Sequence, residues 1–198
     1  MCSKHDNHIR HTAYVGLGSN LRDARACLRT AIQALRDLSD VRLATSPVYL
    51  TEPQDDPDQP WFANQVARLV CAPENTPTSL LHDLQRIEQQ LGRRRDPGRR
   101  YGPRIIDLDL LVFDEVEYAD KKLIIPHPRL RERAFVLVPL CDLAADLRLP
   151  DGHTPRELLR AVPHAVQGRR IFQSSTRRFS DAQMDPDPCR PLHALSHD

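Results

Sequence analysis

The chain has 198 residues and a formal net charge of +1 at pH 7. This length suits one hydrophobic core with tails, and the balanced charge argues against a polycation built to bind nucleic acid. The 5 cysteines are widely spaced and include no Cys-x-x-Cys pair, which argues against a disulfide framework or a zinc knuckle. No apolar run has the length of a signal peptide or a membrane span, so we expect a cytoplasmic protein without a membrane partner.

The two ends of the chain differ in composition from its middle. Residues 1–12 carry histidines without apolar neighbours, which is typical of a disordered leader. Residues 173–198 are polar and rich in Pro, which predicts a disordered tail. We therefore expect a single domain over residues 13–172.

The first elements predicted in that domain are a strand and a helix. Residues 13–17 read as a strand, Gly18 permits a tight turn, and Asn20 is placed to cap a helix whose apolar stripe runs over residues 21–38. The Gly-x-Gly spacing resembles a dinucleotide-binding turn, but the third glycine is missing. We therefore reject a Rossmann fold.

Two further strands and a loop follow. Residues 41–49 predict a second strand, residues 51–60 a loop rich in Pro and Asp, and residues 61–70 a third strand. Phe62 and Asn64 share a face of that strand and could stack on and hydrogen-bond a flat heterocycle. From these residues alone, a core Phe beside an edge Asn is the simpler interpretation.

A second helix is predicted from Thr76, with Pro77 in its first turn, to Gly92. Glu88 falls on the apolar flank of this helix and should have a fixed partner. It could brace an arginine, contact a nucleotide or reach solvent, and the sequence leaves these alternatives open.

The last part of the domain is less regular. We expect a hairpin turn at residues 114–117, a short strand at 123–125, a buried apolar segment at 135–140 and a final helix at 154–162. The order strand, helix, strand, strand, helix, strand is typical of a ferredoxin-like sandwich. We therefore expect an α+β fold, with a mainly antiparallel sheet and helices packed on it.

Residues 93–113 combine an arginine-rich loop with a strand that contains Asp107 and Asp109. Side chains alternate along a strand, so both carboxylates face the same way and could converge on a metal ion. Arginine is the preferred bidentate partner of phosphate. A magnesium nucleotide would satisfy both groups, and the alternative is a set of structural Asp–Arg salt bridges.

Residues 100–111, Arg-Tyr-Gly-Pro-Arg-Ile-Ile-Asp-Leu-Asp-Leu-Leu, resemble the signature of the 6-hydroxymethyl-7,8-dihydropterin pyrophosphokinase family. Residues 14–20, 46–53 and 126–135 are also similar to segments of that family, in the same order and at similar spacing. Phe62 stands where some relatives have Tyr, and Tyr101 where some have Trp.

The resemblance implies a role for each matching residue. Asp107 and Asp109 would hold two Mg²⁺ ions on ATP, and Arg93 and Arg104 would contact the phosphates during transfer. The ATP site would be lined by Gln85, Glu88, Arg95, Tyr101, His127 and Arg133. The pterin would lie between Phe62 and Phe135, with its edge read by Asn64 and by the segment that contains Thr51, Glu52 and Pro53.

The implied reaction transfers diphosphate from ATP to the hydroxymethyl oxygen of 6-hydroxymethyl-7,8-dihydropterin and releases AMP, a step of folate biosynthesis. We expect a monomer that binds these two substrates and no nucleic acid. Two other classes compete with this reading: an RNA-binding module that uses the arginine loop, and a metal-dependent phosphohydrolase that uses the Asp pair. The first lacks the aromatic-rich strand of an RNA-recognition sheet, and the second gives no reason for Phe62, Asn64 and Phe135.

Overall fold

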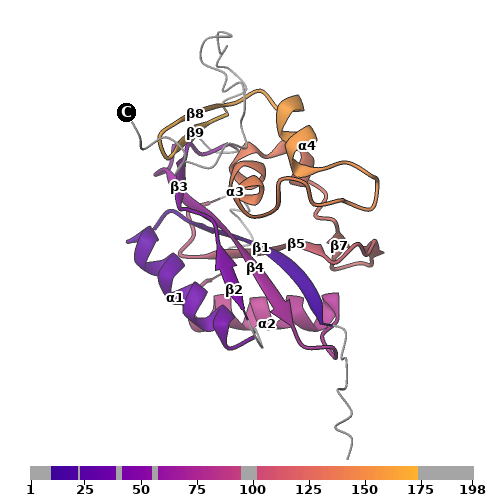
Figure 1. Ribbon diagram of the computed structural model, residues 1–198. Coiled ribbons are helices and arrows are strands. Elements are labelled where there is room, and N and C mark those ends of the chain that lie inside the picture. Colours follow the sequence, from indigo (N-terminus) through magenta and orange to yellow (C-terminus); the bar gives the residue numbers. More distant parts are fainter. Residues whose placement is uncertain (1–9, 22, 39–41, 55–57, 95–101, 174–198) are drawn as a thin grey trace, which may run out of the picture.

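The structure is a computed structural model that describes residues 10–21, 23–38, 42–54, 58–94 and 102–173 (Figure 1). A central sheet separates two pairs of helices, and each face of the sheet has its own apolar core. Of the segments predicted to be disordered, residues 1–9 of the leader at 1–12 and residues 174–198 of the tail at 173–198 lie outside the described residues, as do residues 95–101 of the arginine loop.

The central sheet is mainly antiparallel. Strand β1 (His11–Ser19) pairs with β4 (Phe62–Cys71) on one side and with β5 (Asp107–Phe113) on the other. The short strands β2 (Leu43–Thr45) and β3 (Tyr49–Thr51) both pair with β4. The single strand predicted over residues 41–49 was therefore wrong in extent, because residues 46–48 leave the ladder between β2 and β3.

A hairpin near the end of the described chain extends this sheet. Strand β9 (Arg170–Phe172) pairs in parallel with β3 and antiparallel with β8 (Ala165–Gln167), which gives the order β5-β1-β4-β3-β9-β8. These strands are too short to show a pattern in the sequence, and we did not predict them.

Helices α1 (Ala24–Arg36) and α2 (Pro77–Gln90) cover one face of the sheet, where Leu28, Leu35 and Leu84 are buried. Helix α2 begins as predicted, because the Thr76 side chain caps its first turn. The prediction for α1 was wrong at its start. Asp23 caps the helix, and Asn20 instead accepts a hydrogen bond from the Arg104 backbone N–H at 2.8 Å.

Helices α3 (Ala134–Ala144) and α4 (Pro155–Ala161) pack on the opposite face, and the short 3-10 helix η1 (Leu130–Glu132) precedes α3. The apolar segment predicted at 135–140 is buried in α3, although Pro139 lies inside the helix and cannot donate a backbone hydrogen bond. Helix α4 starts at a capping box formed by Thr154 and Glu157, close to the predicted boundary.

The hairpin expected at residues 114–117 was wrong. Those residues connect β5 to β6 (Tyr118–Ala119), and β6 pairs with β7 (Ile124–Ile125) as a separate two-stranded sheet. The turn of this hairpin lies between Ala119 and Ile124. There the Asp120 side chain accepts hydrogen bonds from the backbone N–H groups of Lys122 and Leu123.

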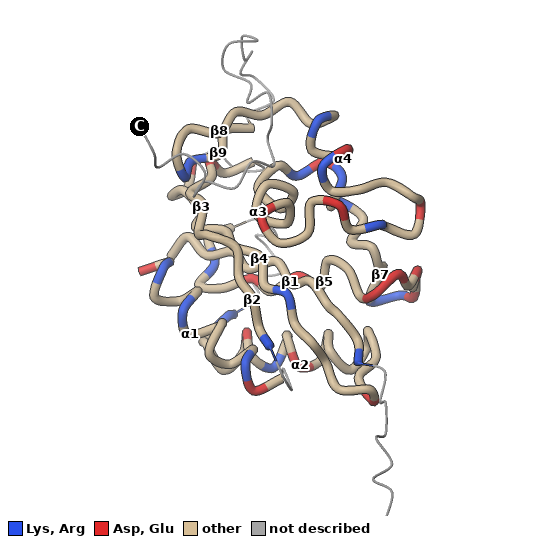
Figure 2. Tube along the Cα trace, in the orientation of Figure 1, with Lys and Arg blue, Asp and Glu red and all other residues tan. Residues whose placement is uncertain are grey.

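Lys and Arg segments alternate with Asp and Glu segments along the described chain (Figure 2). Among the described residues, no helix combines the length and the apolar character that a membrane crossing requires.

Candidate functional site

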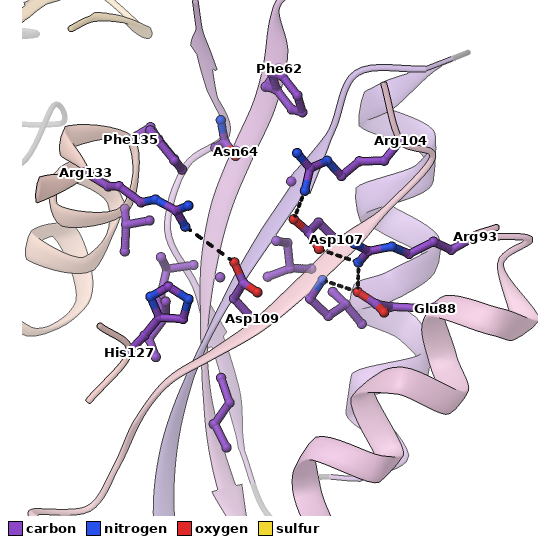
Figure 3. A pocket seen from close by; sticks show the side chains of 18 of the residues that line it. Phe62, Asn64, Glu88, Arg93, Arg104, Asp107, Asp109, His127, Arg133 and Phe135 are labelled. Atoms are coloured by element: carbon purple, nitrogen blue, oxygen red, sulfur yellow. Dashed lines mark hydrogen bonds and ion pairs between the residues drawn. The ribbon is translucent and has the colours of Figure 1, made fainter. Parts of the chain in front are cut away.

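The main cavity has a volume of about 980 Å³ and is lined by residues of β4, β5 and α3, and also by Gln85 and Glu88 near the end of α2. Strand alternation explains its position. Leu108 and Leu110 of β5 point into the core beneath α1 and α2, so Asp107 and Asp109 point to the other face. Phe62 and Asn64 of β4 face the same cavity (Figure 3).

Strand β1 forms the floor of the cavity between these two sets of side chains. Gly18 pairs with Asp107 on one side and with Asn64 on the other, and Gly16 pairs with Asp109 and Val66. Glycine has no side chain, so the floor stays low and the cavity stays open. The tight turn predicted at Gly18 was therefore wrong, because this residue lies within β1.

Asp107 lies between two arginines. Arg104 donates to Asp107 Oδ2 at 2.5 Å, and Arg93 is hydrogen-bonded to Asp107 Oδ1 (Figure 3). The side chains of Arg93 and Asp107 are only 16% and 21% exposed. Because the cavity shields these charges from bulk water, neither partner can be removed without leaving a poorly solvated charge.

Glu88 of α2 holds Arg93 beside Asp107. Its side chain is buried, is ion-paired with Arg93, and accepts a hydrogen bond from the Leu108 backbone N–H at 2.8 Å. The solvent-exposed alternative is excluded. Burial alone would lower the pKa of Arg93, but the neighbouring carboxylates of Asp107 and Glu88 outweigh it and raise that pKa.

Asp109 is held less tightly than Asp107. It is ion-paired with Arg133, the N-cap residue of α3, whose Nη1 lies 3.8 Å from Asp109 Oδ2, and 39% of the Asp109 side chain is accessible. Desolvation by the cavity walls and the negative charge of Asp107 raise the pKa of Asp109, and Arg133 opposes the shift. A carboxylate in this position is favourable for a further cation.

The other end of the cavity is aromatic. Phe62 and Phe135 both line it, and Figure 3 places Asn64 between the two rings. Asn64 is buried, and its amide donates to Thr51 Oγ1 at 2.6 Å. The amide is thus held in one orientation, which suits hydrogen bonding to the edge of a flat ligand.

Arginine side chains link the two ends. The guanidinium of Arg104 lies over the Phe62 ring at 5.6 Å, and that of Arg133 lies over Phe135 at 5.4 Å. His127 also lines the cavity, and burial together with Arg133 lowers its pKa to about 4. Its Nδ1 accepts from the Arg129 backbone N–H at 3.2 Å, as expected of a neutral imidazole.

Most of the candidate residues named from the sequence meet at this cavity. The described ones that line it are Thr51, Glu52, Phe62, Asn64, Gln85, Glu88, Arg93, Arg104, Asp107, Asp109, His127, Arg133 and Phe135. Pro53 is described but does not line it. Arg95 and Tyr101 lie outside the described residues.

Two groups of residues were not predicted from the sequence, one that lines the cavity and one that lies behind its wall. Residues 120–124 of the β6–β7 hairpin line the cavity, although their mixed composition gave no signal. Gln173 lay beyond the domain boundary we drew at 172, yet its side chain accepts a hydrogen bond from the Ala134 backbone N–H at 2.7 Å. Such a tertiary contact has no local signature.

Comparisons with known proteins match the middle of the chain to one family. The family model for 7,8-dihydro-6-hydroxymethylpterin-pyrophosphokinase matches residues 14–145. The 2-amino-4-hydroxy-6-hydroxymethyldihydropteridine pyrophosphokinase of Pseudomonas aeruginosa is 48% identical over 151 residues, which cover 76% of this chain and 91% of that protein. The protein of the same name from Methylorubrum extorquens is 45% identical over 148 residues, covering 74% of this chain and 90% of the relative.

A solved structure supports the fold. The wild-type HPPK-DHPS of Plasmodium falciparum superposes with a TM-score of 0.62 at 16% identity, and the match covers 84% of this chain and 50% of that protein. This chain thus spans about half the length of that longer protein. The family match, the two bacterial relatives and the shared fold agree, and the chain belongs to the 7,8-dihydro-6-hydroxymethylpterin-pyrophosphokinase family.

Proposed function

We propose that this chain transfers diphosphate from ATP to the hydroxymethyl oxygen of 6-hydroxymethyl-7,8-dihydropterin, with release of AMP, in folate biosynthesis. One observation carries the proposal: a single cavity joins an Asp–Arg cluster to a slot formed by two aromatic rings and a fixed amide. The first group suits a triphosphate with its cations, and the second suits a flat heterocycle.

The donor set fits Mg²⁺. This ion takes one or two carboxylates from a protein and fills its other positions with water and substrate phosphates. Among the described residues no group of three potential ligands gathers at one point, in keeping with a site that the nucleotide completes. Asp107 and Asp109 would hold the ions, which would neutralise charge on the triphosphate when bound.

In the structure Arg93 and Arg104 neutralise Asp107. A bound nucleotide offers these guanidiniums a stronger bidentate partner, because phosphate oxygens carry more charge. We infer that Arg93 and Arg104 move from the carboxylate to the phosphates, where they stabilise the charge that develops on transfer. The Arg93 backbone N–H donates to the Glu88 carbonyl at 2.9 Å, which would keep the backbone of Arg93 in place during this exchange.

The pterin would lie between Phe62 and Phe135, with its edge on Asn64. Stacking and an edge contact fix the ring, so the hydroxymethyl oxygen points along the cavity toward the Asp–Arg cluster. Alignment of this kind contributes much of the acceleration in phosphoryl transfer, and we expect no strong general base. The neutral imidazole of His127 and the side chains of Gln85 and Arg133 would contact the nucleotide.

The proposal extends to properties that the family match leaves open. Dependence on Mg²⁺ follows from the carboxylate pair. The strand order β5-β1-β4-β3, with α1 and α2 on one face, supports a ferredoxin-like core. We also propose a monomer, and a cytoplasmic location, which the three described cysteines support because they are free thiols.

The test is formation of AMP from ATP by the purified chain, with and without 6-hydroxymethyl-7,8-dihydropterin and Mg²⁺. We expect AMP only when all components are present. Release of phosphate or AMP without the pterin would point to a phosphohydrolase, and salt-sensitive binding of RNA without any transfer would point to a binding module. Either result would overturn the proposal.

A further inference from the structure

The end of the described chain reaches back to the aromatic end of the cavity. Strand β9 pairs in parallel with β3, and the Leu50 backbone N–H donates to the Arg169 carbonyl at 2.8 Å. Phe172 meets the edge of Trp61 with ring centroids 5.4 Å apart. This hairpin lies beyond residue 145, where the family match ends. It thus places the next residue, Gln173, beside two segments that line the cavity.

Gln173 contacts one side of the pterin slot through its side chain. Helix α3 begins at Ala134, and its N-cap residue Arg133 makes no capping hydrogen bond with its side chain. The first N–H groups of a helix need partners from outside. Gln173 Oε1 accepts from the Ala134 backbone N–H at 2.7 Å, and Gln173 Nε2 is hydrogen-bonded to the Glu132 carbonyl. The Gln173 side chain therefore joins η1, through Glu132, to the first residue of α3.

Gln173 contacts the opposite side of the slot through its backbone. Its N–H donates to Glu52 Oε1 at 2.8 Å. Glu52 follows Thr51, whose hydroxyl fixes the Asn64 amide. Phe135 is the second residue of α3, next to the Ala134 N–H that Gln173 binds. A single residue thus connects the segment that orients Asn64 to the segment that carries Phe135.

We propose that Gln173 is a positioning residue that sets the separation between Phe135 and the Thr51–Asn64 side of the pterin slot. The inference rests on the proposed function, because it concerns how that function's second substrate is held. Gln173 is absent from the cavity lining, so it would act through the residues to which it is hydrogen-bonded. Its loss should loosen the slot and leave the Asp–Arg cluster unchanged.

The first test compares Gln173→Ala with Gln167→Ala. Gln167 lies in the same hairpin but is exposed, so it controls for loss of a glutamine there. We expect Gln173→Ala to raise the KM for the pterin about tenfold, with kcat and the KM for ATP within about threefold of wild type. Gln167→Ala should match wild type. An unchanged pterin KM in Gln173→Ala, or an equal rise for ATP, would overturn the inference.

A milder variant, Gln173→Glu, covers the case in which Gln173→Ala does not fold. Its carboxylate can still accept from the Ala134 backbone N–H but cannot donate to the Glu132 carbonyl. We expect its pterin KM to rise about threefold with an unchanged KM for ATP, and an unchanged pterin KM would count against the positioning role. If wild type forms no AMP, the proposed function fails. If wild type is active and both Gln173 variants match it, only the positioning role fails.

Discussion

The two ends of the cavity are built by opposite means. The polar end gathers Asp107, Arg104 and Asp109 from one short segment, and hydrogen-bonded ion pairs hold it together. The aromatic end draws Asn64 from β4 and Phe135 from α3, and it relies on packing and on fixed amide contacts. One end can change its partners when charge arrives, whereas the other is already shaped for its ligand.

This contrast predicts a division of effects. Substitutions at the polar end should reduce the rate of transfer, because their interactions develop with the charge of the transition state. Substitutions at the aromatic end should raise the pterin KM, because the side chains there bind the pterin equally well in the ground state and in the transition state. Each variant below tests whether the two ends act separately.

Asp107→Ala should have the largest effect. We expect AMP formation to fall by about a thousandfold or more, because the variant loses a metal ligand and leaves Arg104 without its carboxylate partner. The measurement is the rate of AMP release at saturating substrates, with circular dichroism to check the fold. Asp146→Ala is a matched control, because Asp146 is exposed, is ion-paired with Arg156 of α4 and does not line the cavity. Near-normal turnover in Asp107→Ala would refute the metal role.

Arg104→Ala should come next, with kcat lower by about a hundredfold. Because Arg104 also lies over Phe62, this variant is the most direct test of the division between the ends. We expect the pterin KM to change by less than about threefold, and Arg104→Lys to recover only part of kcat because lysine lacks the bidentate fork. A pterin KM that rises as much as kcat falls would mean that the two ends are coupled through this residue.

The polar end could be predicted from the sequence because one strand determines it. The Asp-x-Asp spacing placed both carboxylates on one face, and the arginines beside them in sequence are also beside them in space. The aromatic end was less accessible. Phe62 alone reads as a core residue, and the neighbours that give it a cavity come from α3 and from the glycines of β1.

The incorrect predictions for Asn20 and for the glycines of β1 have similar causes. Asn20 has the right chemistry for a helix cap, but the connection to α1 is longer than expected and Asp23 occupies that position. The glycines of β1 suggested a turn, although their partners on β4 and β5 require an extended strand. Both errors arise because local chemistry permits several structures, and contacts distant in sequence select one.

Asn64→Ala should act on binding rather than transfer. Loss of the edge hydrogen bonds should raise the pterin KM by about 10- to 100-fold, equivalent to about 1–3 kcal/mol, with kcat within about threefold. The measurement is a KM determination for each substrate in turn. A fall in kcat with an unchanged pterin KM would assign Asn64 to the polar end and contradict the division.

Gly18→Ala should reproduce this effect more weakly. A Cβ added at Gly18 would lie 2.9 Å from Asn64 Oδ1, so the amide must rotate away. We expect a pterin KM raised by about threefold to tenfold with little loss of stability, because a side-chain end moves and not the backbone. Gly16→Ala is the comparison: its Cβ would lie 3.4 Å from Leu111 Cδ2 and leave Asn64 in place. Equal KM values in the two variants would argue against a fixed Asn64 amide.

The smallest effect concerns stability and pH. Burial and the charge of Arg133 lower the pKa of His127 to about 4 in the folded chain, compared with 6.5 in the unfolded chain. Between these values the unfolded chain binds more protons, so stability falls as the pH drops from about 6.5 toward 4 and is unaffected above that window. His127→Gln should remove this part of the acid sensitivity, measured as the urea midpoint at pH 7 and at pH 5. His82→Gln is the matched substitution at an exposed position of α2 that does not line the cavity. If His127→Gln lost as much stability as wild type between these pH values, the imidazole would not be shielded in the cavity wall, and its assignment as a neutral contact at the polar end would fail.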